Sequence, residues 1–465
     1  MKSTYQYRFY PDTKQKLELN EWLRISRYWY NRQLGDRFDW WEMNRTRVDA
    51  CPLVSSIAAL REKPNFYSQK KQLPVLKRDL VKVWHSGELL DFKRVDSTVL
   101  QEVSKRVDKA FERFVVGDSK GVRSGRPRFK TVADFKTLTF ATASDDWLKL
   151  VRRNWMYVRL PKLGVVKVRM HRPIPDGFEI KQVSVTLKAD GWIMNIMLED
   201  ESIPVSTPDE IVPTWDNSIG LDAVLHEDVY LATSEGEKLP SLKPLRKNQA
   251  KLDRISTKRN KRKHGSKSRR KLAKREGRVH QRIARSRKDF QYKTAHKIVR
   301  TGKKFIFHED LNLKGLTKRN KAKQADDGTF LPNSQSAKSG LNKSWSDAAF
   351  GNFFTTLNYI AAKAGTVVIA KNPAYTSMVL SYRDEVIFTN CSIRSYWDEQ
   401  ESLMVDRDVN AAINLKRLGL DIFPSIKRRS GKTVVVGTMT QSTTKKILHI
   451  LQKTEDAYAV SERSA

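Results

Sequence analysis

Cysteine is almost absent: among 465 residues only Cys51 and Cys391 occur, and they lie far apart in the chain. Two distant thiols exclude a disulfide framework, and they cannot form a four-cysteine zinc site by themselves. We therefore expect a protein of a reducing, intracellular compartment. The first residues, Met1 to Tyr5, contain no apolar signal region. The chain has no run of about 18 apolar residues, so no membrane-spanning segment is predicted.

Acidic residues are scarce relative to basic ones, with 52 Asp and Glu against 88 Lys and Arg and a formal net charge of +36. Such a surplus repels itself unless a polyanion neutralises it. Nucleic acid is the natural polyanion, because Lys and Arg displace the counterions condensed on phosphates. A basic ribosomal or chromatin-type protein would share this charge, but it would be shorter and would rarely carry eleven Trp. The length predicts two to four structural units.

Hydrophobic periodicity in the first half predicts both helices and strands. Alternation predicts a strand at residues 4–10, and apolar residues at three- and four-residue intervals predict helices at 14–34 and 97–116. A basic Gly/Pro turn at 121–130 follows. Four stretches of period two then predict a small antiparallel sheet or barrel, at 155–160, 164–170, 182–187 and 192–198.

The second half alternates strand and helix patterns. Strands are expected at 218–233, 304–308 and 366–370, and helices at 346–364 and 409–418. Residues 244–300 are the most basic stretch and also contain a helical pattern. A solvated helix face would explain such a charge run, but its density favours a surface that follows a nucleic-acid backbone. The Ser/Thr/Lys-rich residues 428–465 are expected to form a flexible, loosely ordered tail.

Three acidic residues stand out by their context: Asp222 inside an apolar strand, Glu309 at the end of a strand, and Asp408 at the start of a helix. A carboxylate in an apolar strand is costly unless it is paired or bound to metal. This order of elements is the layout of RNase H-like nucleases, in which carboxylates hold two divalent ions about 4 Å apart. Oxygen ligands predict magnesium or manganese.

Each acid also has a purely structural explanation. Asp222 could be a strand-edge residue, Glu309 a helix-capping acid and Asp408 an N-cap. Taken singly, these explanations are at least as good as the catalytic one, and only the combination beside a basic helix favours a metal site. Asp310 and Asp406 are the neighbouring alternatives to the chosen acids.

Residues 219–418 resemble the TnpB family of transposon-encoded RNA-guided nucleases and the compact type V CRISPR effectors. The motifs that carry the resemblance are I-G-L-D (219–222), R-I-A-R-S-R-K-D-F (282–290), F-I-F-H-E-D-L-N-L-K-G-L (305–316), W-S-D-A-A-F-G-N-F (345–353), K-N-P-A-Y-T-S (371–377) and D-R-D-V-N-A-A-I-N-L (406–415). The first half matches more weakly, at Y-R-F-Y-P (7–11), G-R-P-R-F-K (125–130) and L-P-K-L-G-V-V-K-V-R-M-H-R-P-I-P (160–175).

The resemblance implies an α+β multidomain protein. A wedge, oligonucleotide-binding-like β-barrel (1–12 and 117–205) would be interrupted by a helical recognition lobe (13–116). A RuvC-like nuclease domain with the RNase H fold (216–420) would follow, with a basic helical insertion at 244–300 and a reduced nuclease-lobe insertion at about 378–404. The implied partners are a guide RNA and target double-stranded DNA, with a short target-adjacent motif. The implied location is the prokaryotic cytoplasm, associated with the nucleoid when bound to target.

Carried over residue by residue, the resemblance makes Asp222, Glu309 and Asp408 the catalytic carboxylates and the ligands of Mg²⁺ or Mn²⁺. Asp408 is preferred to Asp406 because the family's third acid is followed by one residue and then Asn, as in D-V-N (408–410). The helix carrying Arg287 could either face nucleic acid or brace the metal site. The nucleic-acid-binding residues expected are Arg126, Arg128, Lys130, Arg282, Arg285, Arg287 and Lys288.

One departure from the family pattern concerns zinc. Members of the family usually carry two Cys-x-x-Cys pairs before the last acid, but the first pair here falls on Leu380 and Arg383. The second region offers only Cys391, with Arg394 three residues on. One thiol cannot hold zinc tetrahedrally, so no zinc site is expected. A smaller departure is the sequence Asp222-Ala223-Val224, where the family often has Gly two places after the acid.

Three functions remain open at this point. The intact acids favour an RNA-guided, magnesium-dependent DNA endonuclease. The degraded zinc positions favour an RNA-guided DNA-binding repressor with little or no cleavage. RNase H-like domains also serve guide-independent transposases and resolvases. The origin of the guide, a transposon end or a CRISPR array, is likewise open.

Overall fold

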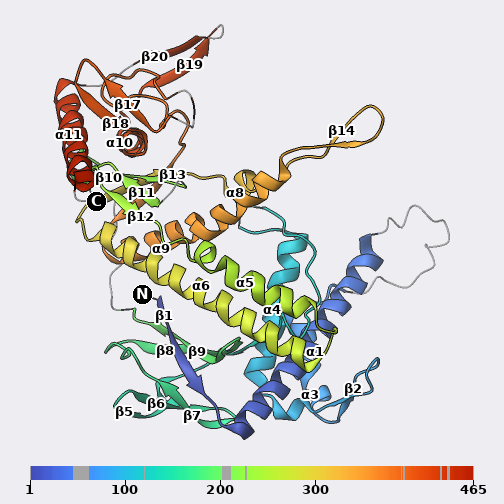
Figure 1. Cartoon of the computed structure of the whole chain (residues 1–465). Helices are drawn as coiled ribbons and strands as arrows, with labels where there is room; N and C mark the ends of the chain where they lie inside the picture. Colours follow the sequence, from blue (N-terminus) through green and yellow to red (C-terminus); the bar gives the residue numbers. More distant parts are fainter. Residues whose placement is uncertain are drawn as a thin grey trace. The chain divides into compact units, whose positions relative to one another are not determined.

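The computed structural model describes residues 2–45, 62–119, 121–201, 211–225, 228–388, 390, 393–429, 432–436 and 440–463. The chain divides into two compact units, residues 1–205 and 206–465 (Figure 1). The first contains β1 Lys2–Tyr10, α1 Thr13–Arg45, α2 Phe66–Lys70, α3 Leu73–Leu76, β2 Val81–Lys82, β3 Leu89–Leu90, η3 Phe92–Arg94, α4 Ser97–Val115, β4 Thr137–Phe140, η4 Asp145–Trp147, β5 Leu148–Arg152, β6 Trp155–Leu160, β7 Gly164–Arg169, β8 Glu179–Lys188 and β9 Gly191–Glu199.

The second unit contains β10 Ser218–Ala223, β11 Val229–Thr233, β12 Lys238–Pro240, α5 Pro244–Asn260, α6 Lys267–Val299, β13 Phe305–Glu309, α7 Leu313–Leu316, β14 Lys323–Gln324, β15 Phe330–Leu331, α8 Gln335–Ala348, α9 Phe350–Lys363, β16 Val367–Lys371, β17 Ser395–Asp398, β18 Leu403–Asp406, α10 Arg407–Gly419, β19 Ser425–Arg429, β20 Lys432–Val436 and α11 Gln441–Arg463. None of the described helices is both long and apolar enough to cross a membrane.

The sheet of the first unit is antiparallel, with the strand order β4-β8-β9-β1-β7-β6-β5. The period-two patterns therefore mark real strands. The expected closed barrel is not found: β4 and β5 form the two edges of the sheet, and the described residues show no pairing between them. Closure of a barrel requires the edge strands to pair, so this sheet is open.

The helices and the sheet of the first unit share one hydrophobic core. Tyr7 and Phe9 of β1 pack into the same cluster as Trp22 and Trp29 of α1, and all four side chains are almost fully buried. The alternation of β1 and the helical spacing of α1 each place one apolar face toward this cluster. The predicted wedge (1–12 and 117–205) and recognition lobe (13–116) therefore share one hydrophobic core, and the division between them stays a prediction.

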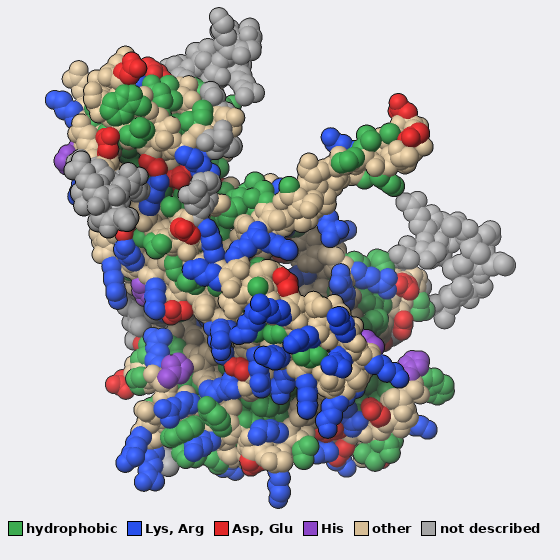
Figure 2. Space-filling view, viewed as in Figure 1, with side chains coloured by type: hydrophobic (Ala, Val, Ile, Leu, Met, Phe, Trp, Pro, Cys, Tyr) green, Lys and Arg blue, Asp and Glu red, His purple; other side chains and the backbone are tan. Residues whose placement is uncertain are grey.

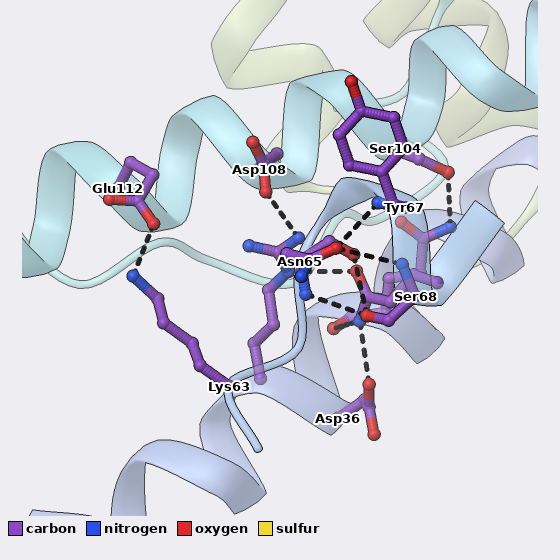
Figure 3. Close-up of polar contacts among 11 residues, drawn as sticks. Asp36, Lys63, Asn65, Tyr67, Ser68, Ser104, Asp108 and Glu112 are labelled. Carbon is purple, nitrogen blue, oxygen red and sulfur yellow. Dashed lines mark hydrogen bonds and ion pairs between the residues drawn. The ribbon is translucent and has the colours of Figure 1, made fainter. Parts of the chain in front are cut away.

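A buried polar network fixes the helices against one another. The Arg37 side chain on α1 is fully buried, donates to Asp108 of α4 over 2.7 Å and donates to Gln69 of α2 over 3.0 Å. On α4, Ser104 also accepts a hydrogen bond from Gln33 of α1 over 2.9 Å. Figure 3 shows Ser104 and Asp108 on α4, together with the capping box of Asn65 and Ser68 that begins α2. A buried guanidinium is costly without such partners, so the two contacts of Arg37 hold α1 against α2 and α4.

The sheet of the second unit has the order β12-β11-β10-β13-β16, in which the first three strands are antiparallel and β10, β13 and β16 are parallel. Helix α10 packs directly on β10. A Cβ atom at Gly220 would lie 2.1 Å from the Ala412 carbonyl oxygen, so this contact requires glycine. The Gly of I-G-L-D therefore brings α10, and the acid at its start, close to the central strand.

The expectation of a loosely ordered C-terminal segment is wrong for α11. Ile447 and Leu451 on this helix are buried, and they pack with Val409 and Ile413 of α10 in one cluster. The two residues stand four apart, on one helix face. A single apolar stripe in a polar stretch gains its stability from the neighbouring core, which the local composition does not reveal.

Candidate nuclease site and nucleic-acid surfaces

Two neighbouring parallel strands bring Asp222 and Glu309 together. Leu221 of β10 pairs with His308 of β13, and the two acids follow these residues directly. Asp222 is 7% exposed and Glu309 is 9% exposed. Their carboxyl groups are hydrogen-bonded to each other, and the Ala223 backbone also hydrogen-bonds the Glu309 side chain. Asp310, the neighbouring alternative, is exposed.

The third acid lies in the first turn of α10. Asp406 is the N-cap of this helix: its carboxylate accepts hydrogen bonds from the backbone N–H groups of Asp408 and Val409, both over 3.0 Å, and pairs with Lys238. The capping role therefore belongs to Asp406. Asp408 is close enough to Asp222 for its charge to act on it, and it accepts a hydrogen bond from Arg394 over 3.1 Å. The charges of the three sequence-predicted acids therefore act on one another, and their catalytic role stays a prediction.

Burial and mutual repulsion raise the pKa values of these acids. Burial, followed by the charges of Glu309 and Asp408, holds the pKa of Asp222 well above its usual value. Burial raises the pKa of Glu309 to about 6. Burial and Asp406 raise the pKa of Asp408, against the opposing charges of Lys238, Arg394 and Arg407. Such a cluster carries its full negative charge only beside a cation.

The raised pKa of Glu309 predicts a pH-dependent gain in stability for the Glu309→Gln variant in the presence of a chelator. Because the folded-state pKa of about 6 exceeds the usual 4.5, ionisation of Glu309 opposes folding, and this cost grows as the pH rises through about 6. At pH 7.5 the free energy of unfolding of the variant should exceed that of the wild type by about 2 kcal/mol. Denaturant unfolding at pH 5 should show less than about half of this gain. An equal gain at both pH values would contradict the assignment.

The described residues contain no group of three or more His, Cys, Asp and Glu side chains arranged to hold a metal ion. The three acids nevertheless supply an oxygen-only donor set, the chemistry that Mg²⁺ and Mn²⁺ prefer. Burial and the neighbouring acidic charges raise the pKa values of Asp222 and Glu309, and a nearby cation would favour their charged forms. The residues therefore fit a divalent ion by chemistry and charge.

Asp347 is a structural acid that the sequence patterns did not single out. Its side chain is 3% exposed. The carboxylate accepts hydrogen bonds from the backbone N–H groups of Leu245 and Arg246 at the start of α5, and it pairs with Arg287 of α6 over 3.1 Å. It therefore ties α5 and α6 to α8. Arg287 is turned inward by this pair, which distinguishes it from the other basic residues expected to bind nucleic acid. Asp347 stands in the W-S-D-A-A-F motif, the one signal that could have identified it.

Helix α6 presents a continuous basic face. Its apolar residues Val279 and Ile283 pack against α5, whereas exposed basic residues recur at three- and four-residue intervals on another side. These are Lys267, Lys271, Lys274, Arg278, Arg282, Arg285 and Lys288. Figure 2 shows Lys and Arg side chains gathered over the α5 and α6 helices. The face includes the predicted Arg282, Arg285 and Lys288.

The G-R-P-R-F-K segment is fixed on α1. Asn31 exchanges two hydrogen bonds with the Lys130 backbone, over 2.7 and 3.0 Å. Arg126 lies 4.2 Å from the Phe38 ring centroid and pairs with Glu42 over 2.7 Å. Arg128 is exposed. Of the three predicted cations in this segment, Arg126 therefore contacts α1, whereas Arg128 projects into solvent.

The solvent face of the first unit's sheet carries rows of cations and aromatic rings that the sequence patterns did not identify. The strand register places Arg169 between Arg8 and Trp155, and Lys167 between Tyr10 and Tyr157. The Lys167 ammonium lies 4.1 Å from the Trp155 ring centroid. Alternating rings and cations on an open sheet suit a polyanion with flat bases.

The region of the absent zinc ligands is held by an ion-paired cluster. Leu380, at the first lost cysteine position, is fully buried. Arg383, at the second, pairs over 3.0 Å with Asp398, which is 1% exposed and also accepts a hydrogen bond from Tyr382. These contacts join the loop after β16 to the β17–β18 hairpin. Cys391 lies outside the described residues.

Two asparagines of the D-R-D-V-N-A-A-I-N-L motif brace this region. Asn410 and Asn414 are fully buried and stand one helical turn apart on α10. The Asn410 amide donates to the Val379 carbonyl over 2.7 Å and accepts from the Ser381 N–H, and the Asn414 amide donates to Thr376 and Val379 carbonyls. The motif therefore fixes the loop after β16 against α10. Asn410, which the sequence comparison used only to choose Asp408 over Asp406, has a structural role in this contact.

Three family models match successive parts of the chain: "Probable transposase" at residues 202–320, "Helix-turn-helix domain" at 1–46, and "Cas12f1-like, TNB domain" at 350–415. The described part of residues 1–46 forms a strand and a single helix. A putative RNA-guided DNA endonuclease of Streptomyces pristinaespiralis is 27% identical over 90% of this chain and 90% of its own length. The putative RNA-guided DNA endonuclease InsQ of Escherichia coli K12 is 28% identical over 81% of this chain and 88% of its own length.

Among solved structures, a Cas12f1–sgRNA–target DNA complex aligns with 90% of this chain and 100% of its own, at 13% identity and a TM-score of 0.30. The matched family models place similarity to a probable transposase and to a Cas12f1-like TNB domain at residues 202–320 and 350–415. The chain is therefore similar to the TnpB family and its compact type V relatives.

Proposed function

We propose that this protein is an RNA-guided DNA endonuclease that cleaves guide-complementary DNA at a RuvC-like site. The observation that carries the proposal is that Asp222 and Glu309, which are buried, and the half-buried Asp408 come from three elements, act on one another through their charges and have raised pKa values. A buried cluster of like charges is costly, and functional sites are where such costs concentrate. The two relatives named as RNA-guided DNA endonucleases support the same activity.

Asp222, Glu309 and Asp408 would hold Mg²⁺ or Mn²⁺, which when bound activates water and stabilises the oxygen that leaves the phosphodiester. The protein's own part is to fix these acids. The parallel pairing of β10 and β13 sets the first two, and the Asp406 cap sets the start of α10. Arg394 holds Asp408 and adds positive charge beside it. The mixed order of the five-stranded sheet supports the assignment to an RNase H-like fold.

Guide RNA and target DNA would be held mainly through their backbones, while pairing between the strands reads the sequence. The α6 basic face, Arg128 and the aromatic–basic face of the open sheet are the surfaces we assign to this contact. Lys130 is half-buried, and its backbone is already engaged by Asn31. We leave Arg287 out of this assignment, because its guanidinium already pairs with the buried Asp347.

The proposal is tested by expressing the protein with its native flanking locus and sequencing the RNA that copurifies. A discrete RNA with a constant part and a variable end is expected, and the complex should cut a duplex that matches the variable end in Mg²⁺. The flank of this RNA would separate a transposon origin from a CRISPR origin. Protein that carries no discrete RNA, or that leaves a matched duplex intact, would refute the proposal.

A second function, guided binding without cleavage, is favoured by one observation: the positions of the zinc ligands are occupied by Leu380 and Arg383. Loss of one nuclease element can accompany loss of cleavage. Binding of a matched duplex by the guided wild type without any cut would establish this function. Cutting by the wild type and not by Asp222→Ala would exclude it.

Neutralising the α6 face should weaken nucleic-acid binding regardless of sequence. We test this with the triple change Lys271→Gln, Lys274→Gln and Arg282→Gln. The logarithm of the binding constant falls as the logarithm of the salt concentration rises, and this slope should become less steep by about 2 to 3, because each lost phosphate contact reduces its magnitude by about one. The measurement is the duplex affinity at several salt concentrations. The matched control changes Lys445, Lys446 and Lys453 of α11, which are also exposed. Equal slopes for the two triples would contradict the assignment.

A further inference from the structure

The β2–β3 hairpin presents the most exposed large apolar side chain of the residues that the structure describes. Trp84 is 92% exposed, whereas Trp22 and Trp29 of the same unit are fully buried. Burial of a large aromatic ring is a major source of folding stability. The exposed ring contributes nothing of this kind to the fold and is available for a contact outside the chain.

Exposure alternates along this hairpin. Leu80, Lys82 and Trp84 are exposed, and the half-buried Val81 and Val83 between them pack against the core of the unit. Leu89 of β3 lies opposite Lys82 and is 54% exposed. The period of two gives the hairpin one inward face and one outward face. The outward face combines apolar surface, one cation and the ring.

The hairpin is held on a fixed support. Arg24 of α1 pairs with Glu88 over 3.2 Å and donates to the Leu89 carbonyl over 3.4 Å. Within the turn, the Val83 N–H donates to the Glu88 carbonyl and the Gly87 N–H to the Val83 carbonyl, both over 2.8 Å. The ring is therefore presented by an anchored element, which lowers the entropy lost when a partner binds.

We propose that Trp84 stacks on an unpaired base of the bound nucleic acid, RNA or DNA. A flat ring beside a lysine is the combination that holds single strands without reading their sequence, the ring through stacking and the cation through phosphate. The cations Lys71, Arg78, Lys82 and Lys93 are also exposed along this segment.

A protein partner fits this face less well, because lysine is depleted from protein–protein interfaces. Lys82 stands in the outward face between Leu80 and Trp84. The inference rests on the proposed function in that it requires a bound nucleic acid, but it does not require cleavage. It assigns a role to residues 81–90, which none of the matched motifs includes.

The test compares Trp84→Leu, which keeps apolar area and loses the aromatic face, with Trp84→Phe, which keeps a ring. The full chain is titrated in chelator with labelled single strands of RNA and of DNA, each of about 20 nucleotides, and with the corresponding DNA duplex. Trp84→Leu should weaken binding to a single strand by about 5- to 150-fold, the equivalent of one stacked base. Trp84→Phe should stay within about threefold of wild type, and duplex affinity should be unchanged.

If Trp84→Leu weakens binding of only one of the two single-stranded probes, that probe shows whether Trp84 stacks on a base of RNA or of DNA. Wild-type affinity of Trp84→Leu for both single strands would overturn the inference and leave the proposed function intact. Equal weakening of single strands and duplex would also overturn it, because the ring would then act on the fold and not on a base. Failure of the wild type to bind any of the probes would refute both the inference and the proposed function.

A second measurement does not depend on affinity. Single strands that carry 5-iodouracil, irradiated in the complex, should form an adduct that mass spectrometry places on Trp84 in the peptide around residues 81–90. The RNA and DNA probes are irradiated separately. Adducts confined to other residues, with unmodified Trp84 in both complexes, would overturn the inference.

Discussion

Asp222→Ala is expected to lower the rate of guided DNA cleavage by about 10³-fold or more. Asp222 lies at the centre of the acid cluster, hydrogen-bonded to Glu309 and within reach of the Asp408 charge. A metal site contributes several kcal/mol of transition-state stabilisation, and each 1.4 kcal/mol is a factor of ten in rate. The measurement is single-turnover cleavage of a matched duplex by the RNA-loaded protein in Mg²⁺.

The matched control is Asp310→Ala, which removes an exposed acid next to Glu309. We expect near wild-type cleavage from it, because Asp310 stands outside the cluster. Binding of the matched duplex should persist in Asp222→Ala. Its thermal stability should not fall, since the change removes a buried carboxylate whose pKa is raised. Cleavage by Asp222→Ala at a rate close to that of the wild type would show that the cluster is not the catalytic site.

Asp398→Ala is expected to destabilise the second unit by about 3 kcal/mol. The change leaves the Arg383 guanidinium and the buried Tyr382 hydroxyl without their shared acceptor. Removing one partner of a buried ion pair costs more than the pair itself contributes, because the other charge stays desolvated. Denaturant unfolding of the full chain measures this loss.

Glu385→Ala is the matched control, because Glu385 pairs with the same arginine over 3.7 Å but is 56% exposed. An exposed pair is worth little, so the control should change stability by less than about 0.5 kcal/mol. We also expect a zinc chelator to leave the unfolding of the wild type unchanged, since the cluster needs no metal. A large destabilisation by the chelator, or equal effects of the two variants, would contradict this account.

Local sequence patterns were sufficient for the elements that carry the acids. Asp222 and Glu309 interrupt strongly apolar stretches, and a charge in such a stretch can be recognised without knowledge of the fold. The strands of the first unit could likewise be predicted, because period two is a local property. Local patterns did not show that the sheet stays open, since closure depends on whether β4 and β5, at opposite edges, meet.

Other features depend on residues that are distant in the chain. The sequence offered Asp406 and Asp408 as alternatives, and a family pattern preferred the second. The structure adds a physical reason, because the Asp406 carboxylate caps α10 and pairs with Lys238. Arg394 entered the sequence argument only as a lost zinc position, yet it contacts Asp408.

The sequence by itself determined the excess of positive charge, the alternation of strands and helices, and the acids that interrupt apolar strands. Each follows from composition or from short-range periodicity. Only the tertiary structure decided the inward turn of Arg287 onto Asp347, the ion pair between Arg383 and Asp398, and the exposure of Trp84. The physical reason is that pairing and burial belong to contacts between distant segments, and no local pattern records which segments meet.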